Sequence, residues 1–344
     1  MNTFKNDIYT VRLRLELKNS FLTDYERKML KRYGESATGD SIIRDILIPS
    51  DMPLHNLHYT IQKLYGWQNS HLRSFHLPEE LYNKLTKRTV KGWADLVGIL
   101  FQPPSELEGE LFWDDDYQSG SINAWLKKKY TGPYIYGGTI EYLENARQDV
   151  QELLHRFNKI EVRESFNDFM KRAEKDEHAE LKIIKEASLI DLTLEEMEES
   201  LYIEGGTDNL LETLEVDKIL AYQEVLATDD FFPVTKELIY NYDFGDDWIV
   251  NITKHKNCDD LIKQNLIDNQ ELKDAKQLVL DKHQPVCIHA EGLSVLDDVG
   301  GLSGFANFLG EIYEGTNKSE SSEARSWARS LGWSARKVSV KSRL

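Results

Sequence analysis

Acidic and histidine side chains in three parts of the sequence could together hold a divalent metal. A Tyr-Asn-Tyr-Asp-Phe-Gly-Asp-Asp-Trp segment carries Asp243 and Asp246, and a later Asp-Asp-Val-Gly-Gly segment carries Asp298. His58 and His71 lie on either side of the end of an expected helix. Hard cations prefer carboxylate oxygens, and borderline metals also accept imidazole. One hypothesis is therefore a metal-dependent hydrolase or nuclease that uses the three aspartates and one of the two histidines.

The same residue types also have purely structural uses. An aspartate at a tight turn accepts backbone N–H bonds, and a histidine beside a strand often satisfies a buried polar group. His55 and His58 are three residues apart with no glutamate between them, which is not the pairing of a zinc-binding helix. The sequence favours the structural interpretation, and no strong motif requires a cofactor, although a divalent metal remains an option.

Other catalytic and cofactor motifs are missing. Cys258 and Cys287 have no CxxC partner, so zinc-ribbon and thioredoxin-type sites are excluded. There is no phosphate-binding GxxxxGK[ST], dinucleotide-binding GxGxxG or GxSxG elbow. The glycine-rich Val299–Gly304 segment could hold an anion at a helix start, but the aspartates before it would repel one. A tight connection is the favoured interpretation.

Composition indicates an ordinary globular protein. The 344 residues include 42 Lys+Arg, 59 Asp+Glu and two cysteines, with a formal net charge of −17. Such a charge argues against a chain that coats itself with nucleic acid or anionic lipid. We see no apolar run of about 18 residues and no apolar segment at the start, so neither a membrane span nor a signal peptide is expected. The low cysteine content favours the reducing cytoplasm.

The elements around the candidate residues predict an α+β fold, with a mostly antiparallel sheet and packed helices. Residues 9–17 alternate apolar and polar types, which predicts a half-buried strand with Arg12 and Arg14 in water. Further strands are expected at 42–48, 71–77, 238–244 and 248–253, and helices at about 54–65 and 305–313. Tyr240, Tyr242 and Phe244 can share one face with Trp248 only if the hairpin loop has an odd length. These aromatic residues, with Trp67 and Phe75, could stack nucleic-acid bases, but core packing is favoured.

The middle and the C-terminal end of the sequence lack the alternating pattern of this sheet and are expected to be mostly helical. Residues 81–232 are expected to form a mostly helical insertion, in which Thr193 and Glu196 make a capping box. The acidic helix that this box opens, at about Thr193–Tyr202, is predicted to be a surface for a protein partner. Residues 316–344 form a basic helix or tail that could bind DNA, with a packed helix as the favoured alternative. The nucleic-acid candidates there are Arg325, Arg329, Arg336 and Lys337.

Two stretches together resemble the plasmid pRiA4b ORF-3-like family. They are Leu57–Gln62 with Gly66–Leu72 and Phe75, and Tyr240–Trp248 with Asp298–Gly301. The resemblance covers about residues 5–80 and 235–312 and implies an α+β domain made of residues 1–80 and 233–315. It implies no reaction, and members are often described as passengers of mobile elements. Asp45 departs from the family pattern, which usually has an arginine there.

Three functional hypotheses follow. The first is a non-enzymatic interaction or accessory module, linked to plasmids or mobile elements, which binds a partner through the acidic helical insertion. The second is the metal-dependent hydrolase or nuclease, and the third is a DNA-binding accessory protein.

Overall fold

The computed structural model describes residues 8–340 except 51, 53, 72, 97–147, 149, 153, 177, 197–235, 336, 337 and 339. The described residues form two compact units. The first unit holds β1 to β3, the last of these as far as Phe75, together with β6 to α16. The second unit holds α3 to η2.

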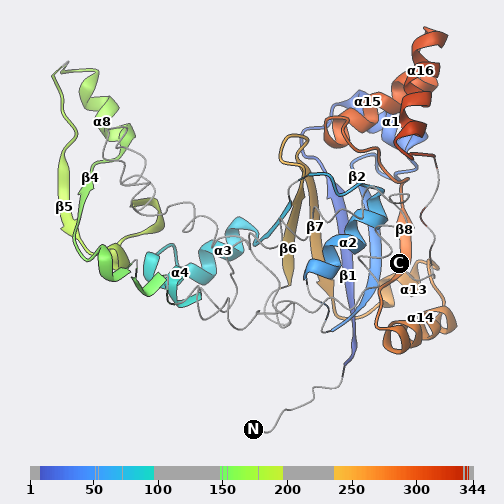
Figure 1. Ribbon diagram of the computed structural model, residues 1–344, viewed down its shortest axis with the longest axis horizontal. Helices are drawn as coiled ribbons and strands as arrows, with labels where there is room; N and C mark the ends of the chain where they lie inside the picture. Colours follow the sequence, from blue (N-terminus) through green and yellow to red (C-terminus); the bar gives the residue numbers. More distant parts are fainter. Residues whose placement is uncertain are drawn as a thin grey trace. The chain divides into compact units, whose positions relative to one another are not determined.

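A six-stranded sheet forms the centre of the first unit (Figure 1). Its strand order is β3-β6-β7-β1-β2-β8, and the four pairs from β6 to β8 are antiparallel. The α+β fold class is therefore confirmed. The strands are β1 (Thr10–Lys18), β2 (Ser41–Pro49), β3 (Arg73–His76), β6 (Glu237–Tyr242), β7 (Trp248–His255) and β8 (Val286–Glu291).

Helices cover both faces of this sheet. On one face, Arg44 of β2 donates from Nε to the carbonyl oxygen of Leu64 in α2 (Leu54–Tyr65). On the other face, Leu47 joins a buried cluster with residues of α13 (Asp259–Lys263) and α14 (Asn269–Lys282). Because successive strand residues point to opposite faces, Arg44 and Leu47 identify the two layers. This is why every residue of β2 is buried.

Three helices pack together at one end of the sheet (Figure 1): α1 (Asp24–Tyr33), α15 (Gly301–Glu314) and α16 (Lys318–Ser330). Glu26 of α1 is buried and accepts hydrogen bonds from Ser303 and Asn307 of α15. These contacts join the N-terminal half of α15 to α1. Trp333 follows α16, donates to the carbonyl oxygen of Ser294 and packs on Phe308.

The hairpin of β6 and β7 has the odd loop that the shared aromatic face required. Tyr242 pairs with Trp248, which leaves residues 243–247 as the loop. Tyr240, Tyr242 and Trp248 are buried, but the side chain of Phe244 is 53% exposed, so its predicted place in the core was wrong. The buried aromatics pack on one another around Trp67 and cannot stack on nucleic-acid bases.

Arg12 also differs from the sequence prediction, because it is buried rather than in water. Its guanidinium binds Oδ1 of Asp45 at 2.7 Å and the carboxylate of Asp260. Oδ2 of Asp45 in turn lies 3.2 Å from Nδ1 of His289. The prediction failed because α13 covers this face of β1, so that the charged side chain has an ionic partner in place of water.

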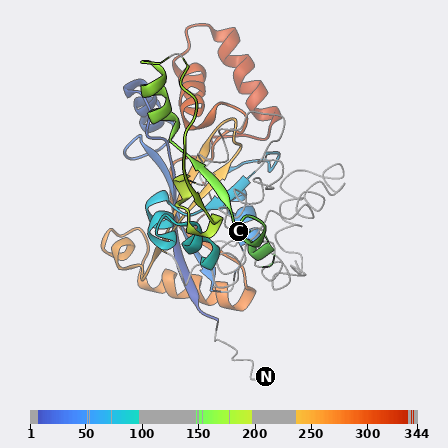
Figure 2. The same cartoon turned by 90° about the vertical axis from the view of Figure 1, so that its left-hand side faces the viewer.

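The second unit combines helices with a small sheet. Its helical elements are α3 (Glu79–Thr86), α4 (Val90–Leu96), α8 (Phe166–Ala173) and the 3-10 turn η2 (Leu189–Asp191). Strands β4 (Ile160–Arg163) and β5 (Ile183–Ala187) pair antiparallel, and Figure 2 shows them beside α8. These two strands were not expected in the insertion at 81–232, which was predicted to be mostly helical. The expected capping box of Thr193 and Glu196 is present, and the partner segment beyond residue 196 lies outside the described residues.

Candidate metal centre

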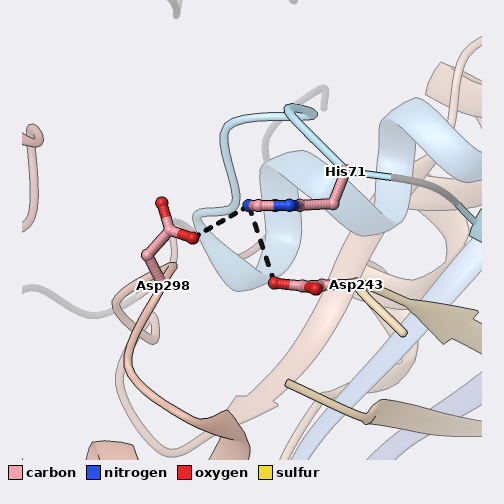
Figure 3. Close-up of side chains that lie close together, drawn as sticks. All are labelled: His71, Asp243 and Asp298. Atoms are coloured by element: carbon pink, nitrogen blue, oxygen red, sulfur yellow. Dashed lines mark ion pairs between the residues drawn. The ribbon is translucent and has the colours of Figure 1, made fainter. Parts of the chain in front are cut away.

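His71, Asp243 and Asp298 meet at one point of the first unit (Figure 3). Nε2 of His71 lies 3.0 Å from Oδ1 of Asp298 and 3.6 Å from Oδ2 of Asp243. One ligand atom from each of the three residues lies within 4.8 Å of the other two. Two ligands about 2.1 Å from a tetrahedral ion are about 3.4 Å apart, so this spacing suits one small ion.

Each of the three residues follows a different element. His71 lies between α2 and β3, Asp243 is the first residue after β6, and Asp298 lies between β8 and α15. Asp243 and Asp298 have φ angles of 52° and 57°, in the left-handed region that aspartate adopts more readily than most residues. β3 and β6 are neighbours in the sheet, and His71 comes shortly before β3 whereas Asp243 directly follows β6.

Asp243 performs two roles with its two carboxylate oxygens. Oδ1 accepts hydrogen bonds from the backbone N–H groups of Gly245 at 3.1 Å and Asp246 at 3.3 Å, so it caps its own turn. Oδ2 is the oxygen that faces His71. The structural and the metal-binding interpretations of this residue are therefore compatible, because each uses a different oxygen.

The centre is open on the side of Asp298. The side chain of Asp298 is 58% exposed, whereas that of Asp243 is 12% exposed. Nε2 of His71 is shielded from solvent and makes no directed hydrogen bond with the described residues. A ring nitrogen that faces two carboxylates without such a bond can bind a cation through its lone pair, after release of any proton it carries.

Two candidate residues are not part of this cluster. His58 is fully buried, with Nδ1 2.7 Å from the hydroxyl of Tyr240 and Nε2 2.7 Å from Oδ1 of Asn69. Both ring nitrogens are thus used inside the protein, which removes His58 as a ligand. Asp246 points to the glycine-rich loop, where its Oδ2 accepts from the N–H of Gly300 at 2.8 Å. Asp246 therefore connects two loops of the centre rather than adding to its ligands.

A buried polar frame lies behind the cluster, and the sequence analysis did not find it. Three successive backbone N–H groups in the segment before His71 each donate to a buried side chain. Gln68 donates to Oδ2 of Asp297, Asn69 to Oε1 of Gln62, and Ser70 to the hydroxyl of Tyr242. No local motif marks these contacts, because the partners are up to 229 residues apart in the chain.

Burial controls the ionisation of this frame. It raises the pKa of Asp297, against the hydrogen bonds from Gln68 and Tyr242, which lower it. It also raises the pKa of the Tyr242 hydroxyl, and the neighbouring Asp297 carboxylate adds to this rise. Tyr242 therefore stays protonated, and its hydroxyl donates a hydrogen bond to Oδ2 of Asp297 at 3.0 Å.

The glycine-rich loop makes a tight connection, as the sequence analysis favoured. Gly301 has a φ of +70°, and a Cβ placed there would lie 2.4 Å from the carbonyl oxygen of Asp246. The close approach of the two loops thus requires glycine at this position.

The basic C-terminal residues are only partly described. Arg325 donates to the carbonyl oxygen of Ile312, and its guanidinium lies 5.6 Å from the ring centre of Tyr313. Arg329 is exposed on α16, whereas Arg336 and Lys337 lie outside the described residues. DNA binding by this segment stays a prediction. In the part of the chain that the structure describes, no helix has the length and apolar character needed to span a membrane.

Comparison with known proteins identifies a family. No curated protein matches the chain. A protein of unknown function from Methanosarcina mazei Go1, known from a crystal structure, is 14% identical over 97% of both chains, with a TM-score of 0.31. The plasmid pRiA4b ORF-3-like protein family matches residues 36–129 and 148–342, which includes most of the region that the sequence analysis read as an enlargement of this chain. The chain belongs to the plasmid pRiA4b ORF-3-like protein family.

Proposed function

We propose that this protein binds one divalent metal ion through His71, Asp243 and Asp298 and is a metal-dependent hydrolase. The observation that carries the proposal is the convergence of one imidazole nitrogen and two carboxylates, from three separate loops, within 4.8 Å of one another. A mixed set of one imidazole nitrogen and two carboxylates suits Zn²⁺, and its oxygen ligands also suit Mn²⁺.

The surrounding charge supports binding of a cation. Asp246, Asp247 and Asp297 lie in the same two loops as the aspartate ligands. Asp243 and Asp298 both face Nε2 of His71. Such an excess of carboxylates attracts cations to the site.

The number of protein ligands supports catalysis rather than a structural role. Structural zinc sites have four protein ligands, whereas catalytic sites have three and keep a position open for water or substrate. Here three ligands converge, and the exposed carboxylate of Asp298 marks the side from which a substrate can enter. A bound metal would supply a Lewis acid and lower the pKa of a water molecule.

Substitution of Asp243 by asparagine tests this proposal well. The asparagine Oδ1 can still accept from Gly245 and Asp246, and asparagine tolerates the left-handed backbone, so the turn is kept. An amide NH₂ replaces Oδ2, the oxygen that faces His71. Asp247→Asn is the matched control, because Asp247 has the same φ of 52° in the same loop but is outside the cluster.

We expect one zinc or manganese ion per chain, measured by elemental analysis after dialysis against trace metal, in the wild type and in Asp247→Asn. Asp243→Asn should lose it while its melting temperature stays within a few degrees. Equal metal content in all three proteins, or none in the wild type, would contradict the proposal.

A second candidate function, the non-enzymatic interaction module, is supported by exposed apolar side chains in the second unit. Phe166 and Met170 of α8 and Ile183 and Ile184 of β5 are each more than 40% exposed. Exposed apolar side chains of this kind can contribute to a partner-binding surface. This proposal includes the acidic segment at Thr193–Tyr202, a cytoplasmic location and a link to plasmids or mobile elements.

The two functions can be separated by affinity capture. A partner that the wild type and Asp243→Asn retain, and that Ile184→Lys loses, would support the interaction module. Identical capture by Ile184→Lys and the wild type would argue against this surface.

A further inference from the structure

We propose that the hydroxyl group of Tyr242 is the positioning group of the metal centre, which fixes the three ligands before a metal binds. This inference rests on the proposed metal-binding function. Tyr242 would touch neither metal nor substrate, and it would act through the residues that it holds.

The connection between frame and ligands is direct in the sequence. Ser70, Tyr242 and Asp297 each immediately precede one ligand: His71, Asp243 and Asp298. These three preceding residues are joined by the Tyr242 hydroxyl, which accepts from the N–H of Ser70 at 3.1 Å and donates to Oδ2 of Asp297 at 3.0 Å. One oxygen atom thus links the three chain segments that carry the ligands.

The chemistry of a phenol suits this role. A hydroxyl has one proton to donate and lone pairs to accept with, so it can join an N–H donor to a carboxylate acceptor. Oδ2 of Asp297 also accepts from the N–H of Gln68 at 2.9 Å. The segment before His71 is therefore held by two backbone hydrogen bonds, from Gln68 to Asp297 and from Ser70 to Tyr242. Because Tyr242 and Asp297 are buried, loss of this bridge would remove the acceptor of the Ser70 N–H and leave Oδ2 of Asp297 with only the Gln68 donor.

Tyr242→Phe removes only this bridge. The Tyr242 ring packs edge-on against the imidazole of His71, with ring centres 5.7 Å apart, and phenylalanine keeps that contact. Tyr65→Phe is the matched control, since Tyr65 is also fully buried. Its hydroxyl makes a long 3.4 Å bond to the carbonyl oxygen of Ile42 and touches none of the ligand-bearing segments.

The experiment measures Mn²⁺ binding by titration calorimetry and amide hydrogen exchange of the metal-free proteins, for wild type, Tyr242→Phe and Tyr65→Phe. Groups that orient metal ligands typically change affinity about 10- to 100-fold when removed, and we expect a loss of that size in Tyr242→Phe alone. The Ser70 amide should also exchange faster in Tyr242→Phe, at least about tenfold, and at the wild-type rate in Tyr65→Phe.

The two measurements separate the two proposals. Mn²⁺ affinity of Tyr242→Phe within twofold of the wild type would overturn the positioning role and leave the metal site intact. If the wild type binds no Mn²⁺ or Zn²⁺, the proposed function fails, and Ser70 exchange then decides the remaining claim. Faster exchange would keep Tyr242 as the group that orders this segment, whereas unchanged exchange would overturn that as well.

Discussion

The carboxylate of Asp246 accepts a hydrogen bond from the backbone N–H of Gly300 at 2.8 Å. This bond joins the hairpin loop, which carries Asp243, to the glycine-rich loop, which carries Asp298. The two aspartates of the candidate metal centre are therefore held together by a residue that is not itself a ligand.

Substitution of Asp246 by alanine should loosen the centre. The lost hydrogen bond is charge-assisted but half-exposed, so we expect the free energy of unfolding to fall by about 1 kcal/mol. Metal affinity should fall with it. Asp247→Asn removes the same charge from the same loop and leaves the bond intact, so its Mn²⁺ affinity should exceed that of Asp246→Ala. Equal Mn²⁺ affinities in the two variants would contradict this role of the hydrogen bond and show that only the charge of the loop affects metal binding.

Gly301→Ala should destabilise the protein more than Gly300→Ala. Both glycines have positive φ angles, so both substitutions cost about 1–2 kcal/mol of backbone strain. Only at Gly301 would the new Cβ meet the carbonyl oxygen of Asp246, at 2.4 Å, and this clash should add about 1–3 kcal/mol. Urea denaturation of the two variants measures the difference, and similar midpoints would refute the close packing of the loops.

Asp45→Asn should be strongly destabilising. Asp45 is fully buried, and its carboxylate binds Arg12 and His289. Removal of one partner of a buried ion pair typically costs about 3–5 kcal/mol. Asp260→Asn should cost less, because the side chain of Asp260 is 41% exposed. Chemical denaturation would measure both, and an equal or reversed order would contradict the assignment of Asp45 as the buried centre.

The same network should make stability depend on pH in the acidic range. Burial by itself would raise the pKa of Asp45, but the hydrogen bonds from His289 and Arg12 outweigh burial and lower it. The hydrogen bond from Arg12 lowers the pKa of Asp260 to about 2. Carboxyl groups with lowered pKa values in the folded state stabilise it above their unfolded pKa, near 3.9.

This stabilisation should therefore be complete above about pH 5 and lost as the pH falls toward 2. Urea midpoints measured from pH 6 to pH 3 should decrease in the wild type. The decrease should be shallower in a variant with Asp260→Asn, which cannot bind the extra proton at that position. If the urea midpoints of the two proteins decreased equally with falling pH, the ion pairs of Arg12 would not be the source of the pH dependence.

Period-two patterns predicted the sheet because burial on one face imposes them. Local spacing in the sequence was enough to predict three features: the strand at 9–17, the odd length of the loop between Tyr242 and Trp248, and the helix that ends before Gly66. Phe244 follows the same alternation and is nevertheless exposed, since the chain leaves β6 at Tyr242. A pattern of types alone cannot mark the residue at which pairing stops.

The sequence predicted which residue types could form the candidate site, but not which of those residues contact one another in the fold. His58 and His71 were equivalent in the sequence, and only the long-range contacts of His58 with Tyr240 and Asn69 separate a buried hydrogen-bonded histidine from a ligand. The burial of Arg12 depends on Asp45 and on Asp260, which is 248 residues further along the chain. Such partners leave no local signal.

Diffraction from crystals soaked in Mn²⁺ tests the central claim most directly. The anomalous scattering map should show one peak about 2–2.3 Å from Nε2 of His71 and from one carboxylate oxygen each of Asp243 and Asp298. The same soak of Asp243→Asn should show no peak there. A wild-type map with no peak at this point, or with the ion bound only elsewhere, would contradict the metal centre.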